Sequence, residues 1–140
     1  MKTDDLTLKD RWRALLAEKP KLRIRDAAAE LGVSEAELLA TDCGTRVTRL
    51  AGDWTQFVKD LTMIGRVMCL TRNEHAVHER YGDFLQSDFF HGMGQVVGPD
   101  IDLRLFMNHW VHGFAVTDQT PEGERQSFQI FDASGEAVHK

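Results

Sequence analysis

Apolar residues recur with helical spacing in the first part of the chain, over about residues 6–40. Two stripes are visible, one made of Leu8, Trp12, Leu15 and Leu16 and the other of Ile24, Ala27, Ala28 and Leu31. Spacings of three and four residues place each set on one face of a helix. Gly32 predicts the end of the second helix, and Ser34 is suited to cap a third over Glu35 to Ala40.

The pattern then changes towards alternation. A short strand is expected near 46–50, and Asp53 is placed to cap a helix that runs to about Met63. Beyond Gly65 the sequence is mostly strand-like, with a polar turn at 72–74. Further turns are marked by glycine and proline at Gly82, Gly92 to Gly94, Gly98-Pro99 and Pro121 to Gly123.

Helices followed by a run of strands predict an α+β fold with a large antiparallel β-sheet. The helical part covers about 6–63 and the mainly β part about 64–140. With 140 residues, of which 42% are hydrophobic and 28% charged, the chain is long enough for one compact core and too short for two full domains. We therefore expect a single domain over 1–140.

The segment Asp100–Phe106 alternates at every position. Ile101, Leu103 and Leu105 would face the core, while Asp102, Arg104 and Phe106 would share the opposite face. A guanidinium beside an aromatic ring is suited to a flat, apolar ligand that carries carboxylates at its edge, and haem fits this description. The alternative is a solvated face with an Asp102–Arg104 ion pair.

Two histidines precede this strand, at His75 and His78. If residues 67–79 are extended, the two point to opposite faces, whereas a helix would put them on one face. One histidine alone is therefore the better candidate ligand. His75 is a candidate axial donor to haem iron, with Glu74 or Glu79 fixing its second ring nitrogen. The alternative is a solvated or hydrogen-bonded histidine.

The remaining histidines have simpler interpretations. Trp110, His112 and Phe114 would share one strand face, opposite His109, which indicates an aromatic packing row rather than a metal site. His91 lies in a glycine-rich turn, where it could approach a ligand, but a solvated loop residue is the simpler interpretation.

The helix, glycine turn and second helix around Gly32 also have the pattern of a helix-turn-helix. The second helix would carry Ser34, Glu35 and Glu37, and these carboxylates would repel phosphates. A net charge of -5 likewise argues against nucleic acid as a partner. We treat these helices as one wall of the domain.

Other features narrow the location and chemistry. The amino terminus MKTDDLTLKDRW lacks the apolar run of a secretory signal, and no later segment has the apolar length of a membrane span, so we expect a cytoplasmic protein without membrane insertion. Cys43 and Cys69 are read as reduced thiols. Because no nucleophile elbow, phosphate-binding loop or paired cysteine motif is present, any redox chemistry would belong to a cofactor.

Four stretches together resemble one family: RWRALLAEKPKLRIRDAAAELGVSEAELLAT, VMCLTRNEHAVHERYG, GPDIDLRLFMNHWVHGFAV and FDASGEAVHK. Over about Leu8 to Lys140 the chain is similar to the haemin-degrading factor family of HemS/ChuS type. That resemblance implies a cytoplasmic protein of bacterial haem uptake. Family members are usually built from two similar halves, each with amino-terminal helices and a large antiparallel sheet, and this chain resembles the first half.

The resemblance also implies a haem site. In two-half members the principal axial histidine belongs to the second half, while the first half contributes an arginine and a phenylalanine that match Arg104 and Phe106. The chain has no counterpart of that histidine, so either His75 serves as an alternative ligand or another subunit completes the pocket. We expect His75 to be the alternative ligand of the haem iron.

The expected function is haem binding in iron acquisition, either with haem breakdown supported by an external reductant or with haem passed between a transporter and a degrading enzyme. The alternative is a haem-free structural or interaction module. A homodimer is expected in either case, because sheet edges and apolar faces are usually paired or covered.

Overall fold

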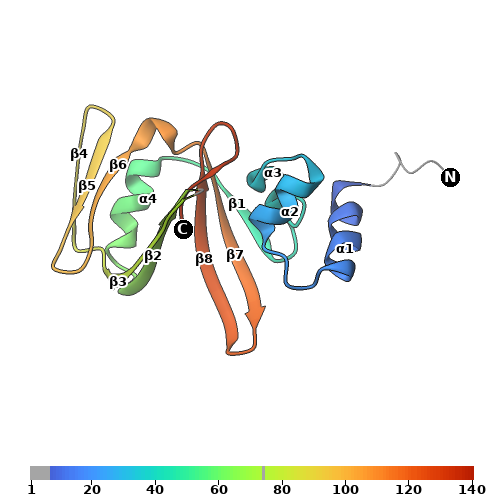
Figure 1. Cartoon of the computed structure of the whole chain (residues 1–140). Helices are drawn as coiled ribbons and strands as arrows, with labels where there is room; N and C mark the ends of the chain where they lie inside the picture. The colour runs from blue at the N-terminus through green and yellow to red at the C-terminus, as the bar shows by residue number, and fades with distance from the viewer. Residues whose placement is uncertain (1–6, 74) are drawn as a thin grey trace.

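Helices at the amino-terminal end are followed by a part built mainly of strands (Figure 1). This computed structural model describes residues 7–73 and 75–140. The helices are α1 (Leu8–Glu18), α2 (Ile24–Leu31), α3 (Glu35–Ala40) and α4 (Trp54–Leu61). The strands are β1 (Val47–Leu50), β2 (Arg66–Arg72), β3 (Val77–Asp83), β4 (Gln86–Phe90), β5 (Met93–Val97), β6 (Asp102–Phe106), β7 (His112–Thr120), β8 (Gly123–Phe131) and β9 (Ala137–His139). The predicted α+β class is confirmed.

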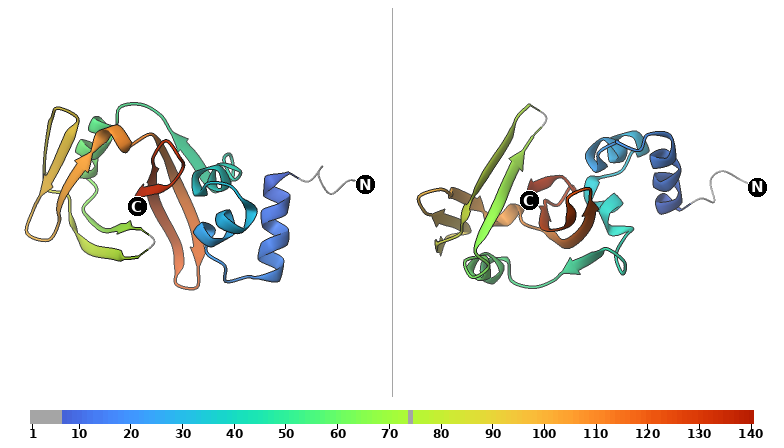
Figure 2. Two further views of the ribbon diagram at one scale, coloured as in Figure 1. Left: turned by 45° about the horizontal axis from the view of Figure 1, so that its top comes forward. Right: turned by 90° about the horizontal axis from the view of Figure 1, so that it is seen from below.

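The strands form three antiparallel sheets, with the orders β1-β7-β8-β9, β2-β3 and β4-β5-β6. The first two are linked where the backbones of Leu70 and Lys140 exchange hydrogen bonds of 2.8 and 3.0 Å. The predicted antiparallel β part is thus present, and it is divided into smaller sheets that lie against one another (Figure 2).

The helix boundaries follow the capping residues that the sequence indicated. Ser34 Oγ accepts a hydrogen bond from the Glu37 backbone nitrogen at 3.1 Å, and Asp53 caps α4 in the same way. Gly32 ends α2 with φ 71°, a left-handed conformation that glycine adopts without steric cost. Among the described residues no helix has the length and apolar character needed to span a membrane.

Helices α2 and α3 pack against α1 rather than presenting a face for DNA. Trp12, Ala27, Ala28 and Leu38 form the centre of this helical cluster. In α3 the buried residues are Glu35, Ala36, Leu38 and Leu39, which is four of its six positions. A recognition helix needs exposed side chains that reach base edges. The burial of α3 therefore supports its assignment as a wall of the domain.

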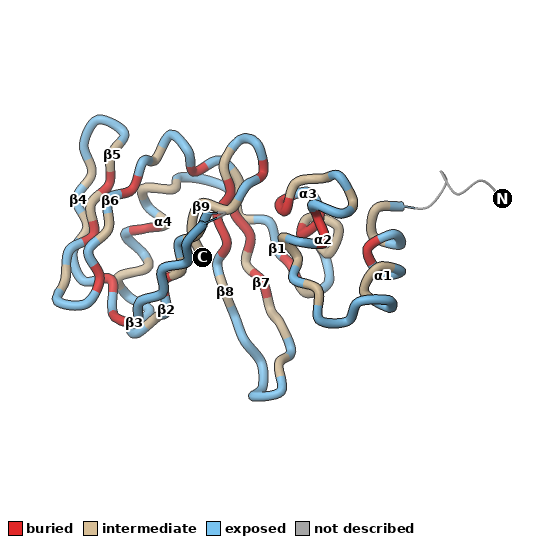
Figure 3. Tube along the Cα trace, in the orientation of Figure 1, coloured by how far each residue is buried: buried red, intermediate tan, exposed pale blue. Residues whose placement is uncertain are grey.

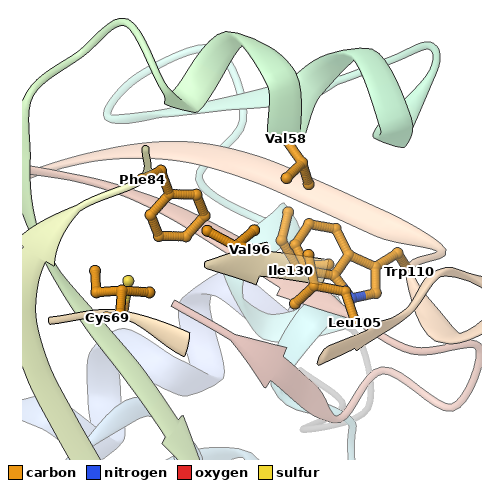
Figure 4. Packing of buried hydrophobic residues seen from close by; sticks show 8 residues of the cluster. Val58, Cys69, Phe84, Val96, Leu105, Trp110 and Ile130 are labelled. Carbon is orange, nitrogen blue, oxygen red and sulfur yellow. The ribbon is translucent and has the colours of Figure 1, made fainter. Parts of the chain in front are cut away.

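A larger cluster joins α4 to all three sheets (Figure 4). Its buried members are Val58, Cys69, Phe84, Val96, Ile101, Leu105, Trp110 and Ile130. They come from α4, β2, β5, β6, β8 and the segments between strands. The burial map shows buried positions in the helical part and in all three sheets, and an exposed tip on the β7–β8 hairpin (Figure 3). We call this set the α4 cluster.

The predicted aromatic row of Trp110, His112 and Phe114 is wrong. The backbone nitrogen of Trp110 donates to the Met107 carbonyl at 3.1 Å in a 3₁₀ turn, and β7 begins only at His112. Trp110 belongs to the α4 cluster, whereas Phe114 packs on Phe131 at 5.9 Å in a separate cluster with α3. The turn interrupts the alternation on which the prediction depended.

Two glycines allow close approach within strands. Gly82, which was predicted to mark a turn, lies inside β3, where an added Cβ would come 2.6 Å from the Cβ of Asp100. Gly113 in β7 lies under the Trp54 ring, and an added Cβ would come 2.8 Å from its Cζ3 atom. Backbone positions this close to a neighbouring element require glycine.

We expect Gly113→Ala to lower the free energy of unfolding by about 1–3 kcal/mol, because the new methyl group displaces Trp54 from the α4 cluster. Urea unfolding followed by tryptophan fluorescence measures this change. Gly98→Ala is the matched control, since its nearest contact is the flexible end of exposed Leu85 at 3.3 Å. Equal stability of the two variants would mean that the Trp54 ring can move away without cost.

Candidate functional site

The three-stranded sheet presents one exposed face, formed by alternate residues of β4, β5 and β6. In register, Met93 on β5 lies between Phe90 on β4 and Phe106 on β6. The neighbouring row consists of Asp88, Gln95 and Arg104. Phe90 and Phe106 are 55% and 59% exposed, so this aromatic row is open to solvent. We call this surface the outer face.

The outer face exists because the other side of the same strands is buried. Leu105 and Val96 are part of the α4 cluster, and Leu103 packs against it. The predicted alternation in β6 is therefore confirmed. Among the described residues Arg104 has no hydrogen-bond or ion-pair partner, so the alternative Asp102–Arg104 ion pair is not formed. The guanidinium remains available to a ligand.

The dimensions of the outer face fit a flat ligand. Neighbouring strands lie about 4.8 Å apart, so the row from Phe90 to Phe106 spans roughly 10 Å. That width is comparable to a planar macrocycle. Arg104 in the adjacent row places a cationic fork beside the apolar surface, which is the arrangement that a carboxylate-edged ring requires.

His75 occupies the turn of the β2–β3 hairpin. Asn73 Oδ1 accepts hydrogen bonds from the backbone nitrogens of His75 at 2.8 Å and Ala76 at 2.9 Å, which fixes the turn. The His75 side chain is exposed and borders a cleft of about 560 Å³ between the turn and α2. Glu74, which was expected to orient the imidazole, lies outside the described residues. Glu79 lies on β3 opposite Leu70.

The structure brings Arg104 and Phe106 together but does not bring His75 to them. His75 is in the turn between β2 and β3, and the other two residues are in the sheet β4-β5-β6. In both views of Figure 2 the β2–β3 turn lies towards the helices, whereas β6 lies on the opposite side of the β part. A flat ligand on the outer face of one chain would therefore not reach His75 of the same chain.

Sequence reasoning missed Phe90 and Met93 as members of the outer face. The signal was the alternation on both sides of His91-Gly92, a two-residue turn in which φ is 51° and 77°. Positive φ at both positions is typical of a type I′ hairpin. Recognising that turn would have paired Phe90 with Met93, and it also places the exposed His91 at the end of the aromatic row.

Two titratable groups, the partly buried His139 and the buried Cys69, are unsuited to ligand binding. The His139 ring is stacked on Trp110 with centroids 6.2 Å apart, and burial lowers its pKa to about 4. Burial raises the pKa of the Cys69 thiol to about 11, which keeps it protonated. No cluster of three or more histidine, cysteine or acidic side chains that could hold a metal ion occurs in the described ranges.

The fold and the outer face together define an α+β domain with an exposed aromatic and cationic surface on an antiparallel sheet. The haemin-degrading HemS.ChuX domain matches this sequence over residues 32–140. The chain therefore belongs to the haemin-degrading HemS/ChuX family.

Relatives in sequence and structure agree with this assignment. The chain is 38% identical over 125 residues to the hemin transport protein HemS of Yersinia enterocolitica, covering 89% of this chain and 36% of HemS. Its structure resembles holo-PhuS, a heme-binding protein from Pseudomonas aeruginosa, with a TM-score of 0.89, 48% identity, and 94% and 39% coverage. It also resembles the heme degrading enzyme ChuS of Escherichia coli O157:H7, with a TM-score of 0.87, 35% identity, and 94% and 40% coverage. The chain thus spans less than half the length of each of these relatives.

The lowered pKa of His139 predicts a pH-dependent stability. Between the ordinary pKa of 6.5 and the folded value of about 4, the unfolded chain takes up a proton that the folded chain does not. We expect His139 to contribute its full stability above pH 6.5 and to lose about 1.4 kcal/mol for each pH unit below it. Urea unfolding at about pH 7.5, 6.0 and 5.0 gives the free energy of unfolding of the wild type and of His139→Leu, and the difference between the two proteins isolates this contribution.

The exposed His109 provides the control, because His109→Leu should leave the pH dependence unchanged. Parallel curves for the wild type and His139→Leu would show that His139 is protonated without penalty in the folded state.

Proposed function

We propose that this chain binds haem in bacterial haem uptake and iron acquisition, acting in the cytoplasm either as a haem carrier or in support of haem degradation. The observation that carries the proposal is the outer face, where Arg104 lies beside the row of Phe90, Met93 and Phe106. We infer haem as the ligand from the relatives, since HemS is a hemin transport protein, PhuS binds heme and ChuS degrades it.

In this proposal each residue of the outer face has a defined part. The rings of Phe90 and Phe106 contact the macrocycle through apolar surface, and Arg104 pairs with a propionate as a charge-assisted hydrogen bond donor. Haem is the cargo or the substrate. Where it is degraded, an external reductant and oxygen supply the redox chemistry, and the protein supplies binding and orientation.

His75 is the proposed axial ligand. Because His75 and Arg104 lie on separate surfaces of one chain, we propose a homodimer in which the outer face of one copy meets the β2–β3 turn of a second copy. Each haem would then receive Arg104 and Phe106 from one chain and His75 from the other. The exposed apolar side chains of the outer face support such an interface, since surfaces of this kind are usually covered.

A haem-free interaction module is the second candidate function. It is favoured by another exposed apolar surface, on the β2–β3 hairpin, where Tyr81 is 58% and Val77 50% exposed. In that case the exposed faces would serve only to bind a protein partner. Addition of haem separates the two functions, because only a haem-binding protein gives a sharp Soret band.

We expect a haem titration to saturate near one equivalent per chain and Arg104→Ala to weaken binding by about 1–3 kcal/mol, because a propionate loses its charged donor. Arg104→Lys should recover only part of this loss, since an ammonium lacks the planar fork. Absorbance titration measures the haem affinity of the wild type and of both variants.

The control is Arg125→Ala, which removes an exposed arginine from β8 with the same change in charge. If the wild type gives only the broad spectrum of free haemin, haem binding is rejected. If Arg104→Ala and Arg125→Ala bind as tightly as the wild type, Arg104 does not belong to the site.

We expect His75→Ala to shift the ferric haem spectrum and weaken binding, because it removes a coordinate bond to iron. In a shared pocket, mixing His75→Ala with Arg104→Ala chains should restore tight binding at about half the sites of each heterodimer, since one of its two pockets is then intact. Absorbance titration of the mixture, with light scattering to establish the dimer, tests both statements.

His78→Ala is the matched control, because His78 lies on β3 opposite Thr71 and outside the turn. An equal effect of His78→Ala, or an effect only of His91→Ala, would identify a different ligand. Haem binding by a strictly monomeric protein would rule out the shared pocket.

A further inference from the structure

The cleft beside His75 is formed by parts of the chain that are distant in sequence. Its walls come from α2, the start of α3, the β2–β3 turn and the segment before β9. It has a volume of about 560 Å³, and its lining includes Arg25 of α2, Arg72 of β2 and His75. We call it the helix–hairpin cleft. It is separate from the outer face and contains neither Arg104 nor Phe106.

Arg72 is the unusual residue of this cleft. Its Nε atom is buried and has no hydrogen-bond partner within the described residues. Buried polar atoms are almost always hydrogen-bonded, and a charged donor without an acceptor is particularly unfavourable. Nε itself is closed to solvent, but Arg72 is only partly buried as a whole residue and lines the helix–hairpin cleft, from which a ligand carboxylate would approach its guanidinium.

Arg25 is held in place beside the same turn. Its Nη1 atom donates to the Asn73 carbonyl at 3.3 Å, which uses one of the five N–H donors of the guanidinium. A second guanidinium near Arg72 increases the attraction for an anion. Glu35, an acidic residue of the lining, is already neutralised because Lys140 Nζ lies 2.6 Å from its Oε2 atom.

Two other carboxylates border the cleft, and they limit what it can hold. Asp26 lies in the first turn of α2, where the helix dipole stabilises its charge, and Glu136 lies next to β9. With these groups present the cleft is not a general trap for anions. It favours a single acceptor group aligned with a guanidinium fork, and a carboxylate matches that geometry.

We propose that the helix–hairpin cleft binds a haem propionate, which accepts hydrogen bonds from Arg72 and Arg25 next to the imidazole of His75. This inference rests on the proposed function. Haem combines a carboxylate for the guanidinium groups with an iron for His75, and it carries two propionates. In a haem shared by two copies, one propionate is bound by Arg104 of the outer face and the other by the cleft of the second copy.

The test compares haem with its iron-containing dimethyl ester, in which both propionates are esterified and uncharged. We expect Arg72→Ala to weaken haem binding about ten-fold, in keeping with the loss of a hydrogen bond to a charged group, and to leave binding of the ester unchanged. Arg25→Ala should behave in the same way, and Arg72→Lys should restore part of the haem affinity. Absorbance titration gives all of these affinities.

Arg66→Ala is the matched control, because Arg66 lies at the other end of β2, where its guanidinium lies over the Tyr81 ring at 5.9 Å. It should bind haem and the ester like the wild type. Thermal melting checks that Arg72→Ala remains folded. A folded Arg72→Ala protein that binds haem normally, or that loses affinity for haem and the ester equally, overturns the proposal.

Failure of this inference is distinguishable from failure of the proposed function. If the wild type does not bind haem, the proposed function is rejected and the inference falls with it. If the wild type binds haem and Arg72→Ala does so equally well, haem binding stands and the propionate site is rejected. Succinate serves as a free carboxylate, and succinate binding that requires Arg72 while haem binding does not would also overturn the assignment to haem.

Discussion

The packing of α4 against the three sheets is the interaction on which the rest of the structure depends. Val58 and Trp110 are both buried in this cluster, with side chains from β2, β5, β6 and β8 around them. Because one side of the β4-β5-β6 sheet is buried in this apolar contact, the alternation of side chains along its strands leaves the other side exposed. The position of Arg104 is therefore a consequence of where Leu103 and Leu105 are buried.

Local signals were sufficient for much of the fold. The capping side chains of Ser34 and Asp53, the left-handed Gly32 and the alternation in β6 each depend on only a few neighbouring residues, and each prediction is confirmed. The predicted row from Trp110 to Phe114 was wrong because Met107–His109 form a 3₁₀ turn, closed by the Trp110 backbone nitrogen, which donates to the Met107 carbonyl. A single turn of this kind interrupts the alternation without leaving a periodic signal of its own.

In the candidate site, too, some features follow from neighbouring residues and others only from the folded structure. The proximity of Arg104 and Phe106 could be predicted, since the two residues are separated by one position on a single strand. Their partners Phe90 and Met93 required the strand register, and the separation of His75 from them required the arrangement of the sheets. Sequence resemblance assigned the candidate residues to one ligand, but only the three-dimensional structure shows that they lie on two surfaces.

Strand β3, which leads to the His75 turn, closely approaches the loop before β6 of the outer face at Gly82 and Asp100. Arg80 strengthens the contact, because its Nε atom donates to the Asp100 carbonyl at 2.8 Å. Strand β3 thus has one end attached to the loop that precedes β6, while its other end leads back to the His75 turn. A strand of this length extends about 20 Å, so β3 sets how far apart the loop before β6 and the His75 turn lie.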